Sequence, residues 1–339
     1  MEKVTLGRTG LEVTKNGFGA LPIQRISKDE AVYLLQKAFY HGINYFDTAR
    51  WYTDSEEKLG AAFAHIRERL IISTKTGADN AADFRKDLET SLTNLQTDYI
   101  DIYQFHNPAV CPKPGDGSGL YEAMVEAKEQ GKIRHIGITN HRIAVAKEAI
   151  ESGLYETLQF PFCYLASEPD LEIVQSCKDH DMGFIAMKAL SGGLITDAAL
   201  AYAYLAQEQF GHVAPIWGVQ RENELDEFLS FQETPPVLTP ERNAQIAKDK
   251  EQLAGDFCRG CGYCMPCPAG IEINNCARMS LLLRRAPQDG YLSEEWQQKM
   301  AKIDECLHCG KCMSKCPYGL HTPDLLKKNY EDYKTFIRK

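Results

Sequence analysis

The chain alternates between short apolar runs and longer amphipathic runs over roughly its first 230 residues, and this alternation restricts the fold more than any other feature. Eight apolar runs have the length of β-strands, and each is followed by a run with helical periodicity. Eight such pairs fit a parallel (β/α)8 TIM barrel of roughly 250 residues. An open doubly wound sheet is the alternative, but no Gly-x-Gly-x-x-Gly motif follows a strand in the first half. We therefore predict an α/β barrel with strands near residues 16–20, 44–48, 70–75, 100–105, 133–138, 157–162, 183–187 and 213–219.

Two further segments flank the predicted barrel. Residues 4–13 have the pattern of a two-stranded hairpin with a Thr-Gly turn, which we expect to close the bottom of the barrel. Residues 232–256 contain two Thr-Pro motifs and then a charged helical run, which is typical of a linker with a connecting helix. The predicted organisation is a barrel over residues 1–235, a linker with a connecting helix over 236–255, and a small, mostly α-helical domain over 256–339.

Four polar side chains follow three successive predicted strands. Asp47 ends the second strand, and Tyr52 comes five residues later in the following loop. Lys75 and His106 lie at the ends of the third and fourth strands. In a parallel barrel the carboxyl ends of the strands share one face, where active sites lie. The sequence therefore predicts that these four side chains meet at that face.

These residue types suit proton transfer to a carbonyl oxygen. A free phenol has a pKa of roughly 10, and a neighbouring ammonium lowers that pKa by stabilising the phenolate. Lys75 could supply the charge and Asp47 could hold it in place, so that Tyr52 donates a proton as hydride reaches the carbon. His106 could orient the same oxygen by donating a hydrogen bond. Taken singly, Asp47 could be a helix cap, Lys75 a solvated side chain and His106 an ordinary strand-end histidine.

At these spacings the four residues together resemble the catalytic tetrad of the aldo-keto reductase family. The resemblance covers roughly residues 1–235 and implies reduction of a small-molecule carbonyl, or oxidation of an alcohol, by hydride transfer with NADPH or NADH. It also implies that Thr139, Asn140 and Gln159 hydrogen-bond the nicotinamide carboxamide. From the residues alone, Thr139-Asn140 is equally a helix N-cap, and Gln159 is equally a surface strand residue.

The resemblance implies further cofactor contacts after the last two strands. Met187 stands where many relatives have a tyrosine against the nicotinamide ring, and Ser191 to Gly193 offer backbone donors near the pyrophosphate. Trp217 and Phe228 replace the proline and asparagine usual in the family, which leaves the choice between NADP and NAD open. The expected contacts in this part of the chain are Met187, Lys188, Ser191, Gly193, Gln220 and Arg221, with Arg221 the candidate for a 2′-phosphate.

Nine of the twelve cysteines lie between positions 258 and 316, and eight of these nine form two runs that each end in Cys-Pro. The second run has the C-x2-C-x2-C-x3-C-P spacing of bacterial [4Fe–4S] ferredoxins, and the first is one residue shorter before its last cysteine. Zinc is the alternative, but it favours two C-x2-C pairs around one tetrahedral site. We predict two [4Fe–4S] clusters bound by Cys258, Cys261, Cys264, Cys267, Cys306, Cys309, Cys312 and Cys316.

The ferredoxin pattern also predicts how the cysteines are shared. In two-cluster ferredoxins the fourth cysteine of each run ligates the other cluster. Cys276 is then left over, and we expect it to pack in the core. The insertion between the runs, with helices expected over residues 272–285 and 293–304, resembles the two-cluster domains of fumarate reductase-type electron-transfer subunits. One cluster would be held by Cys258, Cys261, Cys264 and Cys316, and the other by Cys267, Cys306, Cys309 and Cys312.

Charge and hydropathy narrow the range of partners. The formal net charge of −9 argues against nucleic acid or an acidic membrane surface as a binding partner, because like charges repel. No apolar run is long enough to cross a bilayer, so we expect a cytoplasmic protein. Basic residues near the clusters would favour an acidic ferredoxin or flavodoxin as redox partner, and the candidates are Lys327, Lys328, Lys334, Arg338 and Lys339.

Three functions are compatible with these features. The first is a nicotinamide-dependent carbonyl reductase whose clusters are structural, regulatory or connected to an external carrier. The second is a reductase in which the clusters feed single electrons to a substrate or flavin in the barrel, because hydride transfer moves two electrons together whereas each cluster passes one. The third is a non-catalytic redox carrier or sensor, and the intact tetrad argues against it.

Overall fold

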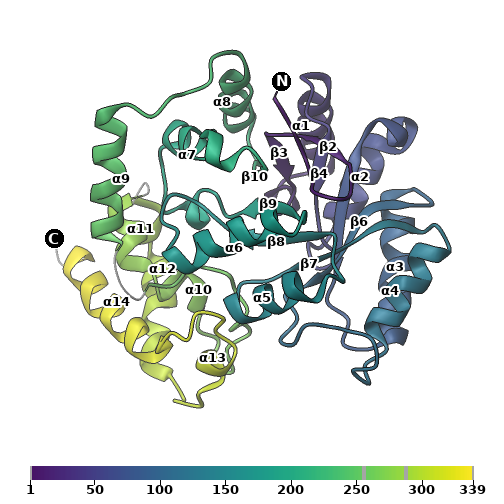
Figure 1. Cartoon of the computed structure of the whole chain (residues 1–339). Helices are drawn as coiled ribbons and strands as arrows, with labels where there is room; N and C mark the ends of the chain where they lie inside the picture. Colours follow the sequence, from purple (N-terminus) through teal and green to yellow (C-terminus); the bar gives the residue numbers. More distant parts are fainter. Residues whose placement is uncertain (1, 254–256, 286–288, 338–339) are drawn as a thin grey trace. The chain divides into compact units, whose positions relative to one another are not determined.

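The computed structural model describes residues 2–253, 257–285 and 289–337, and the chain divides into two compact units. The first, called here the barrel unit, runs to Ala189 and resumes over Ala199–Leu238. The second, called the cysteine unit, contains Leu190–Ala198 together with the chain from Thr239 onward. Figure 1 traces both units by colour along the chain. Nothing in the sequence predicted that residues 190–198 would group with the cysteine unit.

Eight parallel strands close into a barrel in the order of the sequence, and the last strand pairs with the first. The predicted barrel is therefore confirmed. Register at the site is set by pairs such as Asp47 with Ser73 and Lys75 with Gln104. The barrel strands are β3 (Gly17–Gly19), β4 (Tyr45–Asp47), β5 (Ile71–Thr76), β6 (Ile100–His106), β7 (Ile133–Thr139), β8 (Thr157–Pro161), β9 (Gly183–Met187) and β10 (Val213–Gly218).

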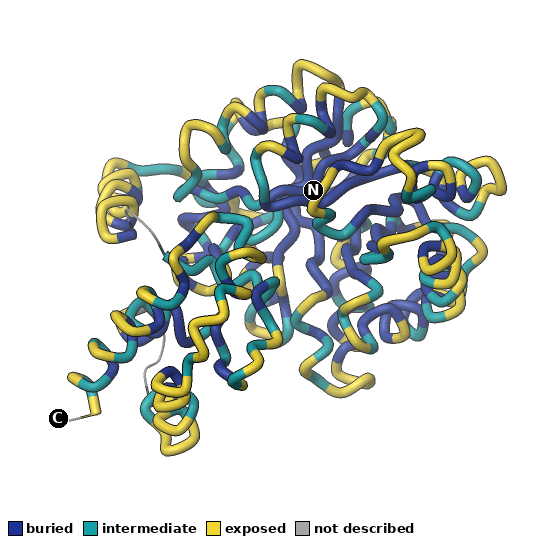
Figure 2. The backbone as a smooth tube through the Cα atoms, turned by 90° about the horizontal axis from the view of Figure 1, so that it is seen from below, coloured by how far each residue is buried: buried dark blue, intermediate teal, exposed yellow. Residues whose placement is uncertain are grey.

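An α-helix follows each barrel strand, and the strands are buried while the outer faces of the helices are exposed (Figure 2). Polar side chains cap the N-termini of several of these helices. Ser27 and Glu30 form a capping box before the first helix, and the Asn80 side chain accepts hydrogen bonds from two backbone amides at the third. The helices are α1 (Lys28–Tyr40), α2 (Ser55–Phe63), α3 (Ala81–Leu95), α4 (Leu120–Glu129), α5 (Ile143–Ser152), α6 (Glu168–Asp179), α7 (Ala198–Leu205) and α8 (Glu222–Glu233).

A hairpin of β1 (Lys3–Thr5) and β2 (Glu12–Thr14) packs on the strands of the barrel. Its buried residues Val4 and Val13 share an apolar cluster with Tyr45, at the start of β4, and with other strand residues. The predicted hairpin is therefore present, and it shields the apolar barrel interior from water.

The cysteine unit has its own apolar core and is mostly helical, as predicted. Leu194 and Ile271, both fully buried, belong to this core. Cys276 is fully buried in it as well. Its helices are α9 (Pro240–Gln252), α10 (Ile273–Cys276), α11 (Met279–Arg285), α12 (Glu294–Ala301), α13 (Lys311–Ser314) and α14 (Thr322–Ile337).

The single helix expected over residues 272–285 is broken at Ala277 and Arg278. Asn329 on α14 binds both sides of the break. Its side-chain amide donates to the Ala277 carbonyl at 3.1 Å, and its oxygen accepts from the Ser280 amide at 2.8 Å. The expected helical stretch is present as α10 and α11, and the break between them arises because a side chain distant in sequence satisfies backbone groups that a continuous helix would have paired.

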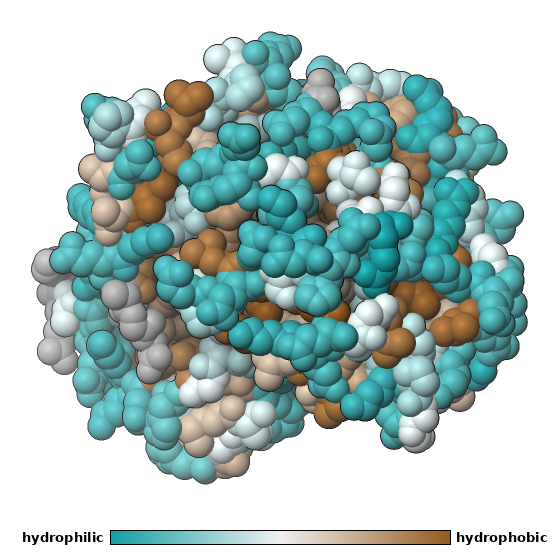
Figure 3. Space-filling view, viewed as in Figure 1, coloured by the Kyte–Doolittle hydropathy of each residue, from teal (hydrophilic) through white to brown (hydrophobic). Residues whose placement is uncertain are grey.

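The face of the molecule seen in Figure 3 is largely hydrophilic, with small separate hydrophobic patches. No helix in the described part of the chain is long and apolar enough to span a membrane.

Replacing Asn329 with alanine should destabilise the cysteine unit. The change leaves the Ala277 carbonyl and the Ser280 amide without their partner, at a cost of about 1–3 kcal/mol. We expect iron-replete Asn329→Ala to lose its visible absorbance at a lower temperature than the wild type. Lys327→Ala, an exposed position on the same helix, is the control. Equal melting of both variants and the wild type would contradict the role of Asn329.

Candidate active site and cysteine cavities

The centre of the barrel mouth is an ion pair between Lys75 and Asp47. Lys75 Nζ lies 2.6 Å from Asp47 Oδ2 and donates to the Thr48 carbonyl at 2.6 Å. The two charged residues are only 1% and 2% exposed. Burial lowers the pKa of Lys75, and the charge of Asp47 opposes that shift. A buried pair of this kind is stable only where further hydrogen bonds satisfy both ions.

Polar side chains on neighbouring strands supply those hydrogen bonds to Asp47. Ser73 Oγ donates to Asp47 Oδ1 at 2.6 Å. Gln159 Nε2 donates to Asp47 Oδ2 at 3.3 Å, and Gln104 Nε2 donates to Gln159 Oε1 at 2.9 Å. The side chain of Gln159, expected at the nicotinamide, therefore lies against the ion pair. Sequence reasoning missed Gln104, although it faces the same side of its strand as His106, two residues later.

Gly137 makes room for this amide network. It pairs with Gln104 across β6 and β7, and a Cβ at Gly137 would lie 2.4 Å from Thr157 Oγ1 and 2.8 Å from Gln104 Cγ. Any larger residue would push the Gln104 side chain out of its place. The glycine is required by close packing, since its backbone lies outside the positive-φ region.

Tyr52 and His106 lie beside the ion pair. Lys75 Nζ is 5.3 Å from the centre of the Tyr52 ring, and the Tyr52 and His106 rings meet edge to face at 5.8 Å. Burial, together with the charge of Lys75, lowers the pKa of His106 to about 3. His106 is therefore a neutral imidazole near pH 7, and its Nδ1 is buried without a hydrogen-bond partner among the described residues. The structure thus brings the four predicted residues together.

Trp51 forms an exposed wall of the site that the sequence did not reveal. Its ring lies 5.0 Å from the His106 ring, yet the residue is 56% exposed. The Trp51 ring also packs against Gly77, because a Cβ on Gly77 would lie 1.7 Å from Trp51 Cζ2. An indole that is held by packing and still open to solvent can contact a bound substrate.

Thr139 and Asn140 are buried at the end of β7 and take part in loop hydrogen bonds. Thr139 Oγ1 accepts from the Asn107 amide, and Asn140 Nδ2 donates to the Pro108 carbonyl at 2.9 Å. Asn140 Oδ1 accepts from the Arg142 amide ahead of α5. The N-cap of α5 is Arg142, without a side-chain cap bond, so Thr139 and Asn140 are not the helix N-cap, and their bonds instead fix both side chains in the loop after β7.

The remaining expected cofactor positions are divided between the two units. Met187 ends β9 and Lys188 follows it with a φ of 57° in the barrel unit, whereas Ser191 and Gly193 belong to the cysteine unit. The amides of Gln220 and Arg221 donate to the Glu224 carboxylate before α8, and the side chain of Arg221 is 67% exposed.

The two departures from the family pattern have a packing reason. Trp217 and Phe228 are 2% and 3% exposed, and their rings stack at 4.5 Å. Trp217 also stacks on Tyr202 at 6.0 Å. Both residues fill the space behind β10, so the side chain of Phe228 is part of the core of the barrel unit.

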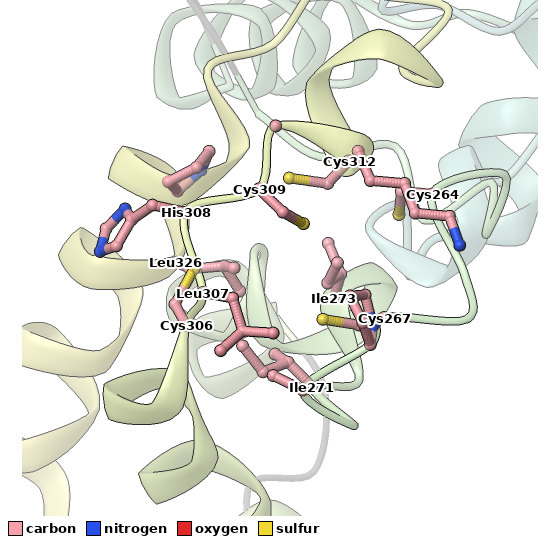
Figure 4. Close-up of a pocket in the computed structure, with 15 residues that line it drawn as sticks. Cys264, Cys267, Ile271, Ile273, Cys306, Leu307, His308, Cys309, Cys312 and Leu326 are labelled. Atoms are coloured by element: carbon pink, nitrogen blue, oxygen red, sulfur yellow. The ribbon is translucent and has the colours of Figure 1, made fainter.

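The eight predicted cluster cysteines line two small, partly enclosed cavities. Figure 4 shows sulfur atoms of the second cavity directed toward a common space. Among the described residues no three metal-binding side chains converge closely enough to hold a single ion. The first cavity is lined by Cys258, Cys261, Cys264 and Cys316, and the second by Cys264, Cys267, Cys306, Cys309 and Cys312.

The chemistry of these cavities suits a cationic group larger than one ion. Burial raises the pKa of the Cys258 and Cys312 thiols and raises the pKa of Cys264 to about 12. Such thiols give up their protons readily only when a positive centre binds the sulfur. Most other lining residues are apolar, including Ile273, which lines both cavities. The residues present therefore fit [4Fe–4S] clusters.

The pKa of His106 gives a direct test of the site. Its imidazole carbon resonance, assigned by its loss in His106→Gln, should keep the neutral shift as the pH falls from 8 to 5. Because the folded pKa lies below the ordinary 6.5, the unfolded chain binds the proton first, and stability falls as the pH drops below 6.5. An inflection near pH 6.5 in the folded protein would refute the burial of this ring.

Comparison with known proteins agrees with this architecture. The model of the aldo/keto reductase family matches residues 15–199, and that of a 4Fe-4S dicluster domain matches residues 257–321. The 6-dehydroglucose reductase of Novosphingobium aromaticivorans is 32% identical, over 73% of this chain and 89% of that protein.

Solved structures show the same barrel. Aldo-keto reductase AKR11C1 of Bacillus halodurans in its holo form is 25% identical with a TM-score of 0.62, over 74% of this chain and 96% of that one. A Klebsiella pneumoniae aldo-keto reductase in complex with NADPH is 21% identical with a TM-score of 0.60, over 73% and 94%. The chain belongs to the aldo/keto reductase family of oxidoreductases and carries a 4Fe-4S dicluster domain after the barrel.

Proposed function

We propose that the barrel reduces a carbonyl group, or oxidises the matching alcohol, with Tyr52 as the proton donor and acceptor. The observation that carries the proposal is the buried Lys75–Asp47 pair beside Tyr52 and His106 at one barrel mouth. A bound nicotinamide would supply or accept the hydride. The 6-dehydroglucose reductase relative suggests a sugar-derived carbonyl as the first substrate class to try.

Each side chain then has one task. The ammonium of Lys75 stabilises the phenolate that Tyr52 becomes after it gives its proton to the substrate oxygen. Asp47 holds that ammonium in place, and Ser73 and Gln159 hold Asp47. His106 is neutral, so it can donate a hydrogen bond to the substrate oxygen without competing for the proton.

The cofactor contacts are proposed in the same way. Thr139, Asn140 and Met187 lie at the ends of β7 and β9, where they would meet a nicotinamide ring and its carboxamide. Gln159 would act mainly on Asp47, since its amide already binds that carboxylate. The exposed guanidinium of Arg221 would favour NADP over NAD by binding a 2′-phosphate.

Tyr52→Phe tests the catalytic assignment. We expect kcat to fall by about 100-fold or more while the Kd for NADPH stays near the wild-type value, because the phenol acts only on the proton. Trp51→Phe, next in the chain, should keep the proton chemistry and change mainly KM. Unchanged kcat in Tyr52→Phe with every substrate that the wild type turns over would sink the proposal.

We propose that the two cavities hold two [4Fe–4S] clusters with crossed ligation. One would be bound by the first three cysteines of the first run and the last of the second run. The other would be bound by Cys267 and the first three cysteines of the second run. The linings of the two cavities support this assignment, although Cys264 borders both. The bound clusters would store and pass single electrons.

Paired substitutions distinguish crossed from uncrossed ligation. Cys258→Ser with Cys267→Ser should remove both clusters if ligation is crossed, and only one if each run binds its own cluster. Cys258→Ser with Cys316→Ser should leave one cluster, about four of about eight iron atoms, if ligation is crossed. Cys276→Ala is the control, since Cys276 lines neither cavity. Iron content and the reduced-state EPR signal are the readouts, and the reverse pattern would exclude crossed ligation.

A second candidate function is exchange of single electrons with an external carrier. Cys309 is exposed beside Leu307, which is 65% exposed, and Lys311 and Lys315 are exposed on and after α13. This combination favours an acidic ferredoxin or flavodoxin near the second cavity. Of the basic residues that the sequence suggested for this role, Arg338 and Lys339 lie outside the described residues.

A further inference from the structure

Arg278, between α10 and α11 in the cysteine unit, carries a charge that no carboxylate of the described residues pairs with. The charges that act on it are those of the Cys258, Cys261 and Tyr291 side chains. Its Nη1 donates to the Gly192 carbonyl at 2.8 Å, and its Nε is buried without a hydrogen-bond partner in the described part of the chain. Because a guanidinium keeps its proton in proteins, this position is a fixed positive charge.

The guanidinium packs against the backbone of the first cysteine run. A Cβ on Gly260 would lie 2.6 Å from Arg278 Cζ, and the φ of Gly260 is +64°. Gly260 stands between Cys258 and Cys261, which both line the first cavity. The Gly260 amide also donates to Cys258 Sγ at 3.4 Å. Glycine at this turn therefore leaves the space in which the guanidinium approaches two predicted cluster ligands.

A cluster in this cavity would place negative charge next to that cation. A [4Fe–4S] cluster held by four thiolates carries about −2, and about −3 after it gains one electron. An apolar cavity disfavours the extra negative charge, because the surroundings solvate it poorly. Nearby charge and hydrogen bonds to the sulfurs set the reduction potential of such clusters. A fixed cation against the ligands thus favours the reduced state.

The basic side chains that line the cavities themselves are placed differently. Lys311, which lines the second cavity, is exposed, so water and salt screen its charge. Arg259 lines the first cavity, and its guanidinium packs on the Phe257 and Tyr318 rings. Arg278 combines a buried Nε with contact to the ligand backbone, and so its charge is the least screened of the three.

We propose that the charge of Arg278 raises the reduction potential of a [4Fe–4S] cluster bound in the first cavity, which makes that cluster a store for one electron. This inference rests on the proposed binding of two clusters. The step is the transfer of one electron from an external single-electron carrier to the cluster. No bond forms or breaks, and the guanidinium keeps its proton throughout.

The closing experiment is a redox titration of iron-replete, full-length protein with dithionite, followed by the reduced-state EPR signal. Arg278→Met and Arg278→Lys are a matched pair, since the new side chains have similar length and differ in charge. Arg284→Gln is the control, because Arg284 binds Asp332 and lines neither cavity. Each variant is also made with Cys306→Ser and Cys309→Ser, which remove ligands of the second cavity only and so assign the signal of the first cluster.

In Arg278→Met we expect the reduction equilibrium of the first cluster to become less favourable by about threefold to tenfold, up to 59 mV for one electron. Arg278→Lys should recover at least half of that shift, and Arg284→Gln should match the wild type. The potential of the second cluster should stay the same in all three. An unchanged potential in Arg278→Met, or an equal loss in Arg278→Lys, would overturn the inference.

Iron content keeps the test decisive if a variant fails to hold the first cluster. Loss of iron in Arg278→Met with retention in Arg278→Lys would support the role of the charge, whereas loss in both would assign Arg278 to packing and overturn the inference. The proposed function fails separately. A wild type that takes up no cluster would remove the proposed clusters, whereas a wild type with both clusters and a potential insensitive to Arg278→Met would overturn this inference alone.

Discussion

The Lys75–Asp47 ion pair is the interaction on which the barrel mouth depends. Both groups are almost fully buried. Without further hydrogen bonds, the desolvation free energy of such an ion pair exceeds the attraction between its two charges. The barrel meets that cost with hydrogen bonds from Ser73 and Gln159 to Asp47 and from Lys75 to the Thr48 carbonyl. The space that Gly137 leaves for Gln104 belongs to the same arrangement, because Gln104 holds Gln159 in position. A charge held this firmly would need little reorganisation in the proposed step, in which a proton leaves the neighbouring phenol.

The cysteine unit poses a different electrostatic problem. Its thiols are buried in apolar cavities, where burial raises the pKa of Cys258, Cys264 and Cys312, so thiolates there need positive charge close by. Two iron–sulfur clusters would provide it. Because Cys264 and Ile273 line both cavities, one layer of side chains would separate the clusters. Hydride transfer moves two electrons together and each cluster passes one, so the proposed hydride step does not need the clusters.

Much of the fold could be predicted from sequence because its signals are local. Strand length, helical periodicity and polar strand ends located the barrel and the four site residues, and cysteine spacing located the cavities. The missed features depend on contacts between distant residues. Gln104 acquires its role from Gly137 and Gln159, and Trp51 is held by Gly77.

In the cysteine unit, too, the features that the sequence did not predict depend on contacts between distant residues. Asn329 interrupts the expected helix over residues 272–285. The assignment of the 190–198 loop to this unit follows from the burial of Leu194 and the bond from Arg278 to Gly192, which no spacing encodes. Trp217 and Phe228 looked like losses of cofactor contacts in the sequence, whereas in the structure they pack on each other.

The central claim is that hydride passes between nicotinamide and substrate in the barrel while the clusters stay out of that step. Its most direct test is an anaerobic titration of iron-replete protein with NADPH and then NADH, with the visible absorbance of the clusters as the signal and dithionite as the positive control. The account predicts nicotinamide binding without bleaching, and full bleaching by dithionite. Bleaching by either nicotinamide would contradict it, because the clusters would then take electrons from the cofactor.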